Sequence, residues 1–145
     1  MIKIIKLKLI LLIILNLTNS ASAENSFFEE GQNKYDEKKY KESKFLFQRS
    51  ITFNPKDSDS YLYLAKIFNF EDNQKEVEKN INTVLLLDPK NEEANYLLME
   101  IELKKSNYLK VNELIKNFSK ICHKLCEKKT LIIKSLKDLE PKNGS

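Results

Sequence analysis

The chain has 145 residues, with 25 lysine and arginine side chains, 21 aspartates and glutamates, two glycines, three prolines and two cysteines. Three of the basic residues lie within the first 23, so the rest of the chain carries (25 − 3) − 21 = +1, and its pI of 8.9 does not indicate nucleic-acid binding. Two glycines and the lack of a long Ser/Gly/Pro run exclude a glycine-rich phosphate loop and an internal linker, and predict one all-helical domain.

Residues 1–23 have the features of a secretory signal peptide in the required order. Lys3, Lys6 and Lys8 give a basic start, LILLIIL at 9–15 is apolar, and ASA at 21–23 fits an Ala-x-Ala cleavage site. An uncleaved membrane anchor would need about 20 apolar residues, and this stretch is much shorter. We expect cleavage between Ala23 and Glu24, and a secreted, periplasmic protein without membrane insertion afterwards.

Two similar segments follow, offset by 85 − 51 = 34 residues: ITFNPKDSDSYLYL at 51–64 and LLLDPKNEEANYLL at 85–98. Each contains a proline turn, and Asp57 and Asn91 then stand directly before a helical run, as N-cap residues do. Glu92 and Glu93 fill the first turn of the later run, where acidic residues suit the helix dipole. Each of these segments is therefore expected to end one helical hairpin and begin the next, because each hairpin buries its apolar face by stacking on a neighbour.

Apolar residues recur at helical spacing on both sides of these turns. The runs at 58–70 and 75–88 each place apolar side chains on one helix face: Tyr61, Leu64, Ala65 and Phe68, then Val77, Ile81, Val84 and Leu85. A last run at 128–140 does so with Leu131, Ile132, Leu136 and Leu139. These runs predict helices that pack on one side.

The spacing of aromatic, small and proline residues resembles the tetratricopeptide repeat (TPR). The middle block carries the pattern at Tyr61, Leu64, Ala65, Phe68, Val77, Ile81 and Pro89, the block before it at Phe27, Gly31, Ser43, Phe47, Ser50 and Pro55, and the block after it at Leu98, Tyr108, Val111, Ile115 and Phe118. The resemblance implies an all-α fold: an α-solenoid of three TPR-like helical hairpins near 24–57, 58–91 and 92–125, a C-terminal capping helix at 126–140, and a frayed tail at 141–145. The chain departs from the pattern with Glu30 and Lys34 in the first repeat, which suits a terminal repeat with one solvated side, and with Asn95, Met99 and His123 in the third.

Both cysteines and the only histidine lie in ICHKLC at 121–126. In an oxidising compartment Cys122 and Cys126 are expected to form a structural disulfide, which requires a turn at 122–126 because a continuous helix places the two residues poorly for the bond. Free buried thiols and a redox or metal helper are the alternatives, but the spacing fits neither haem attachment nor a redox C-x-x-C, and a metal site lacks a further Cys or His ligand. We expect no cofactor and no metal.

No nucleophile or metal-ligand motif is present, so we expect a non-enzyme. The TPR resemblance implies a groove that binds a protein or peptide partner and no nucleic acid. The groove candidates on this chain are Phe28, Gln32, Tyr35, Lys66, Phe70, Tyr96 and Glu100. Aromatic residues at helical spacing are also typical of core, so packing is the competing interpretation.

The two halves of the chain differ in charge. Residues 24–100 carry 11 − 16 = −5 and residues 101–145 carry 11 − 5 = +6. This asymmetry fits a lysine-rich solvated surface, and equally a self-associating structural protein in which the acidic part of one copy meets the basic part of another.

Overall fold

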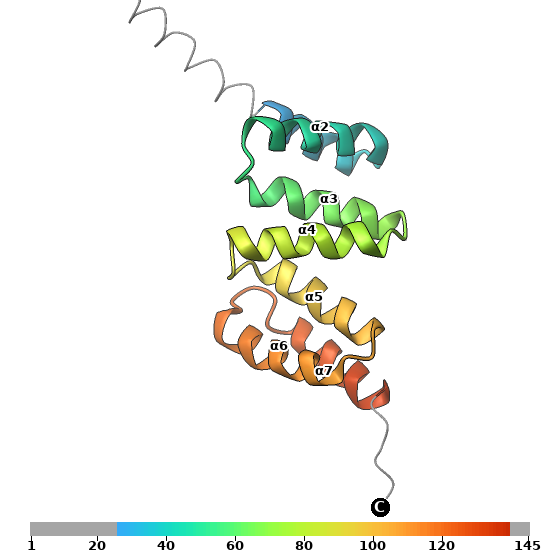
Figure 1. Cartoon of the computed structure of the whole chain (residues 1–145), viewed down its shortest axis with the longest axis vertical. Helices are drawn as coiled ribbons and strands as arrows, with labels where there is room; N and C mark the ends of the chain where they lie inside the picture. Colours follow the sequence, from blue (N-terminus) through green and yellow to red (C-terminus); the bar gives the residue numbers. More distant parts are fainter. Residues whose placement is uncertain (1–25, 140–145) are drawn as a thin grey trace, which may run out of the picture. The chain divides into compact units, whose positions relative to one another are not determined.

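The computed structural model describes residues 26–139, and every regular element within that range is an α-helix (Figure 1). The predicted signal peptide, the cleavage site between Ala23 and Glu24, and the tail at 141–145 lie outside the described residues. The chain divides into two compact units at Ile67 and Phe68, and each unit is considered by itself.

The first unit contains a helix over residues 26–36, α2 (Tyr40–Phe53) and most of α3 (Ser58–Phe70). Gly31 lets the first helix approach α2 closely, because a Cβ atom at Gly31 would lie 2.8 Å from Cε1 of the buried Phe47 ring. The Ser43 hydroxyl donates a 2.8 Å hydrogen bond to the Gly31 carbonyl oxygen. Small residues at the positions predicted from the repeat therefore form the contact between the two helices.

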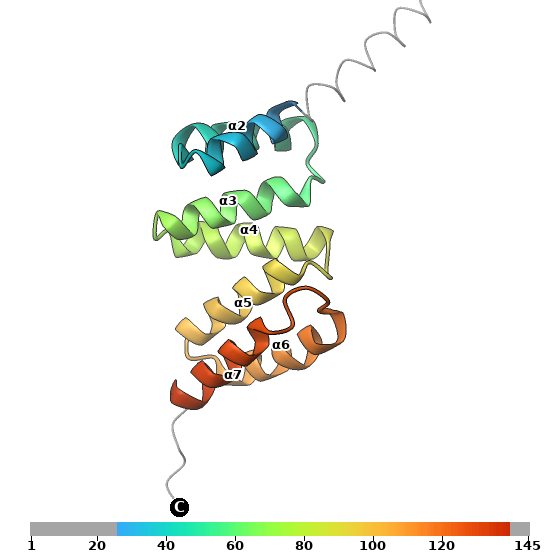
Figure 2. The same cartoon turned by 180° about the vertical axis from the view of Figure 1, so that it is seen from behind.

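The second unit contains α4 (Gln74–Leu87), α5 (Glu92–Lys104), α6 (Tyr108–Ile121) and α7 (Lys128–Leu139). Figure 2 shows α7 beside α5 and α6, and all three helices contribute to one apolar core. Its buried members are Met99, Leu103, Val111, Leu114, Phe118, Ile132 and Leu136. A final helix that covers its predecessors matches the predicted cap. None of the helices in the described range has the length and apolar character needed to cross a membrane.

The turn inside each hairpin has the same geometry. Lys38, Asp72 and Ser106 have positive φ angles of 60°, 55° and 58°, and they are 34 residues apart. In each turn the N–H group of the positive-φ residue donates to the carbonyl three positions earlier, and the next N–H group donates to the carbonyl five positions earlier. In the first turn these hydrogen bonds run from Lys38 to Tyr35 and from Lys39 to Lys34. This is the Schellman ending of a helix, so the period seen in the sequence is also a period of the backbone.

Side-chain oxygens cap the helices α3 to α6, as predicted at Asp57 and Asn91. The Asp57 carboxylate accepts from the N–H groups of Asp59 and Ser60, and the Asn91 amide oxygen accepts from Ala94 N–H at 3.0 Å. Asn73 and Asn107 cap α4 and α6 in the same way. Each capping hydrogen bond supplies an acceptor for a backbone N–H group in the first turn, which has no acceptor within the helix.

The departures from the repeat pattern have structural explanations. Glu30 is exposed, and Lys34 pairs with Glu37 at 3.4 Å and Glu42 at 3.7 Å, as expected for a solvated first repeat. In the third repeat Met99 is fully buried, and the Asn95 amide donates to the carbonyl oxygens of Pro89 and Asn91. Thus Asn95 contributes to the turn before α5 in place of an aromatic contact.

Candidate functional site

Four of the predicted groove residues surround one tyrosine, Tyr63, in the first unit. The Tyr63 ring has edge contacts with Tyr35 and Phe28, with centroid distances of 5.1 and 6.0 Å. The Gln32 amide donates a 3.1 Å hydrogen bond to the Tyr63 hydroxyl, and the Lys66 ammonium lies 4.7 Å from the ring centroid. The structure therefore brings Phe28, Gln32, Tyr35 and Lys66 together.

This cluster is also part of the packing of the first unit. The Tyr63 ring stacks on the fully buried Phe47 ring at 4.8 Å, and Phe28 contacts the same Phe47 ring at 5.8 Å. Both Phe28 and Tyr63 are half-buried. Since their rings contact one another, much of the aromatic surface predicted for a ligand holds the helices of this unit together.

The second unit contains a pocket of about 410 Å³ between α5 and α7, which we call the α5–α7 pocket. Tyr96 and Glu100, two predicted groove residues, line it from α5 together with Leu97. From α7 it is lined by Leu131 and Leu139, both of which are exposed. The leucines on the outer edge of the predicted capping helix thus face a cavity beside the predicted groove residues.

The predicted groove residue Phe70 follows the pocket-lining Asn69 at the end of α3. It is the last residue of α3 and its side chain is 71% exposed. Phe70 itself does not line the α5–α7 pocket, although its neighbour Asn69 does.

Tyr96 and Glu100 form a short hydrogen bond at the edge of the pocket. The Tyr96 hydroxyl donates to Glu100 Oε1 at 2.6 Å, and the Lys128 ammonium lies 5.5 Å from the Tyr96 ring centroid. Burial, and then the Glu100 carboxylate, raise the pKa of Tyr96 to about 12 from its ordinary value of 10.0. Both effects favour the neutral phenol, which keeps its donor hydrogen at physiological pH.

Alkaline titration of the protein is expected to show a component from Tyr96 with a midpoint near pH 12. Because this pKa is raised on folding, the associated stability is fully present below pH 10 and is lost as the pH rises through about 12. Ultraviolet absorbance at the phenolate band measures the ionisation of Tyr96. Tyr96→Phe should remove the late component, and Glu100→Gln should shift it only part of the way back because burial is the larger cause. An unchanged titration in Tyr96→Phe would contradict the assignment.

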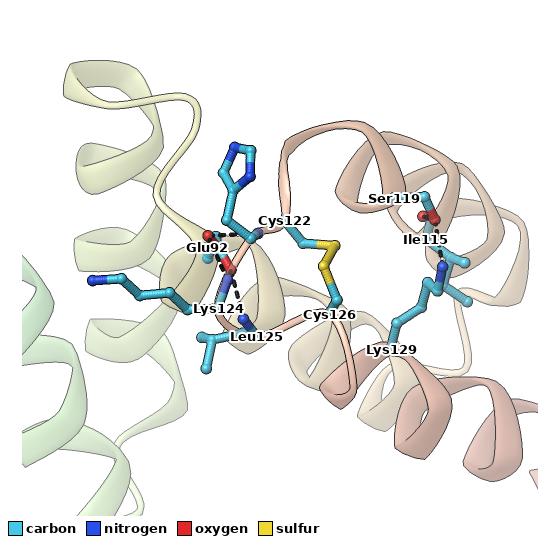
Figure 3. Close-up of a disulfide and its surroundings, with 9 residues drawn as sticks. Glu92, Ile115, Ser119, Cys122, Lys124, Leu125, Cys126 and Lys129 are labelled. Atoms are coloured by element: carbon cyan, nitrogen blue, oxygen red, sulfur yellow. Dashed lines mark hydrogen bonds between the residues drawn. A yellow bond between two sulfur atoms is a disulfide. The ribbon is translucent and has the colours of Figure 1, made fainter.

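Cys122 and Cys126 form a disulfide, with their Cα atoms 5.2 Å apart. The helix α6 ends at Ile121 and α7 begins at Lys128, so the bond closes the intervening loop at 122–126, which we call the disulfide loop (Figure 3). The turn required by a bond between these two cysteines is therefore present.

The disulfide loop holds the carboxylate of Glu92, the first residue of α5 (Figure 3). Glu92 Oε1 accepts from the N–H groups of His123 at 2.8 Å and Lys124 at 3.2 Å, and Oε2 accepts from Lys124 at 3.0 Å and Leu125 at 2.7 Å. Hydrogen bonds from Leu125, His123 and Lys124 lower the pKa of Glu92. The sequence predicted only a favourable position at a helix dipole for Glu92 and missed this contact, because its partners lie more than 30 residues away.

Within residues 26–139, no group of three or more His, Cys, Asp or Glu side chains is arranged to hold a metal ion. His123 is exposed, and its backbone N–H takes part in the Glu92 contact.

No protein-family model and no curated protein matches the sequence. Among solved structures, the chain is similar to the Arabidopsis OM64 TPR domain, with a TM-score of 0.71, 16% identity, and coverage of 82% of this chain and 98% of that chain. It is also similar to the TPR2B domain of yeast Sti1 in complex with pHsp70, with a TM-score of 0.71, 12% identity, and coverage of 80% and 97%.

A third similar structure is the Yersinia enterocolitica type III secretion chaperone SycD in complex with a peptide of the translocator YopD. Its TM-score is 0.68 at 15% identity, with coverage of 80% of this chain and 91% of that chain. The described residues therefore have the tetratricopeptide-repeat fold, which confirms the predicted all-α class of TPR-like hairpins.

Proposed function

We propose that this chain is a non-enzymatic protein-interaction scaffold that binds a peptide or a partner helix at the α5–α7 pocket. The carrying observation is the pocket itself, a cavity of about 410 Å³ where Leu131 and Leu139 of α7 face Tyr96 and Glu100 of α5. Exposed leucines and a half-buried tyrosine around a concave site are suited to an apolar anchor side chain. The similar structures of Sti1 and SycD contain pHsp70 and a YopD peptide, and this supports the same general use here.

Asn69, Glu100, Lys104 and Ser135 are the polar residues that line the pocket besides Tyr96, and Glu100 is the one carboxylate among them. Glu100 lies beside Tyr96, and a carboxylate that already accepts one hydrogen bond has lone pairs for another. A lysine or arginine of the ligand next to its apolar anchor would supply that donor. We therefore propose a ligand with a leucine or phenylalanine side chain followed or preceded by a basic residue.

We further propose that the scaffold works in the cell envelope after export. The signal-like features of residues 1–23 support export, and the Cys122–Cys126 pair supports an oxidising compartment because disulfides persist there. Location of the processed chain in fractionated cells would decide this part of the proposal.

Selection of a displayed random-peptide library on residues 24–145 tests the binding proposal. Peptides with an apolar anchor beside Lys or Arg are expected. Leu131→Glu should weaken their binding at least about tenfold, since it places a charge in the apolar part of the pocket. Leu109→Glu is the matched control, because Leu109 is 87% exposed on α6 and does not line the pocket. Its binding should stay within about twofold of wild type.

Two outcomes would contradict this function. Peptides that bind both variants equally would place the site elsewhere on the chain. The self-association alternative predicts instead that selection returns no peptide and that the protein sediments as an oligomer dissociated by salt, because its contacts would be between acidic and basic surfaces.

A further inference from the structure

The disulfide loop joins two features that take no part in the proposed binding site: a reducible bond and a carboxylate held by backbone donors. Its three consecutive N–H groups, from His123 to Leu125, all donate to Glu92 at the start of α5. The loop then leads directly into α7, whose first turn begins with Lys128 N–H donating to the Leu125 carbonyl at 2.9 Å. The conformation of five residues therefore connects the start of α5 to the start of α7 (Figure 3).

The Cys126 side of the disulfide lies at the surface, whereas Cys122 packs against the apolar core. Cys126 is exposed and Cys122 is half-buried. Lys124, Lys128 and Lys129 lie within three residues of Cys126, and the acidic groups beside the loop are Glu127 and the Glu92 carboxylate that the loop holds. Thiol–disulfide exchange requires a thiolate to reach a sulfur, and nearby positive charge attracts the thiolate and favours the cysteine thiolate that leaves.

We infer that the Cys122–Cys126 disulfide is a redox-modification site for a dithiol reductant, and that reduction releases Glu92 from the loop and loosens α7 from α5. A reductant thiolate attacks the Cys126 sulfur and forms a mixed disulfide, while the electron pair of the broken bond moves to the Cys122 sulfur, which is then protonated. The second thiolate of the reductant displaces the Cys126 thiolate, which is protonated in turn. Two electrons and two protons pass from the dithiol to the protein, and the reductant leaves as a disulfide.

Reduction acts on Glu92 through the shape of the loop. Three successive N–H groups point at one carboxylate only in a tightly turned backbone, and the covalent closure between Cys122 and Cys126 limits the loop to few conformations. Without the disulfide, the loop can adopt further conformations in which these three N–H groups donate to water instead of to Glu92. The Glu92 contact is then weaker. The contacts of α7 that remain include Ile132 and Leu136 in the core and the hydrogen bonds from Tyr108 to the Leu139 carbonyl and from Lys129 to Ser119.

This inference rests on the proposed function in one respect, the effect on ligand binding. Leu131 and Leu139 of α7 line the α5–α7 pocket, so a loosened α7 presents a less organised pocket. Reduction is therefore expected to weaken peptide binding, and oxidation to restore it.

Hydrogen exchange of residues 24–145, read by mass spectrometry with and without dithiothreitol, tests the modification itself without any ligand. Reduction should speed exchange of residues 123–125 and of α7 by roughly tenfold or more and leave α4 unchanged. Cys122→Ser with Cys126→Ser should show the fast pattern without reductant. Glu92→Gln should show part of it in the oxidised protein, whereas the control Glu127→Gln, which removes a neighbouring charge, should not.

Equal exchange of residues 123–139 in the oxidised and reduced proteins, or a disulfide that dithiothreitol fails to reduce in the folded protein, would overturn the inference. Peptide affinity is measured separately on both forms. If α7 loosens and affinity is unchanged, the coupling to the pocket is wrong while peptide binding stands. If neither form binds a peptide, the proposed function fails while the exchange result still decides the redox site.

Discussion

Replacing Phe47 with alanine will lower the free energy of unfolding by about 3–5 kcal/mol, the largest effect expected of a single truncation in the first unit. The Phe47 side chain is fully buried, stacks on Tyr63 at 4.8 Å and contacts Phe28 at 5.8 Å. Alanine would remove the ring from the middle of this aromatic cluster and leave a cavity that rigid neighbours fill poorly. Urea denaturation followed by circular dichroism measures the change.

The matched control lies two residues earlier on the same helix. Phe45 is 58% exposed, so Phe45→Ala removes the same ring from α2 with little loss of buried surface. Its effect should stay within about 0.5 kcal/mol. Equal destabilisation by the two substitutions would show that Phe47 is not the centre of this packing.

Gly31→Val is expected to destabilise the protein by about 1–3 kcal/mol, through crowding rather than through a cavity. A Cβ atom at Gly31 would lie 2.8 Å from Cε1 of Phe47, closer than Cβ atoms approach in proteins, and 3.0 Å from Cδ1. The better helix propensity of valine over glycine offsets only about half a kcal/mol. The same denaturation experiment gives the result.

A double substitution identifies the cause. Phe47→Leu alone should destabilise, but in the Gly31→Val background it makes room for the added methyl groups. The combined loss should therefore be smaller than the sum of the single losses by about 1 kcal/mol. Strict additivity would mean that Gly31→Val destabilises for a reason other than contact with the ring.

Most of the fold follows from the sequence because its signals are local and repeated. The 34-residue offset, Pro55 and Pro89 located the hairpin boundaries, and the structure caps the next helices at the predicted Asp57 and Asn91. Helical spacing placed Leu131, Ile132, Leu136 and Leu139 on one face of the last helix. Ile132 and Leu136 are buried as predicted, whereas Leu131 and Leu139 are exposed. Because the same pattern occurs in each repeat, it can be recognised even where one residue departs from it, as Asn95 does in the third repeat.

The candidate site was only partly predictable, because it depends on contacts between helices. The TPR resemblance implied that Tyr96 and Glu100 face a groove, and the structure adds α7 beside them to form the pocket. Spacing does not reveal that the rings of Phe28 and Tyr35 pack on Tyr63. Nor does any local signal connect Glu92 with a loop more than 30 residues away.

The three hairpin turns have a consequence for how the repeat assembles. Lys38, Asp72 and Ser106 all adopt a left-handed backbone conformation that glycine enters freely and that costs other residues about 1 kcal/mol each. In an isolated pair of helices, this conformational cost therefore makes it less favourable for the turn to form and bring the two helices together. Closure becomes favourable only when neighbouring helices bury the apolar faces, so the turns make each repeat dependent on its neighbours and favour assembly as a cooperative group over partly formed single hairpins.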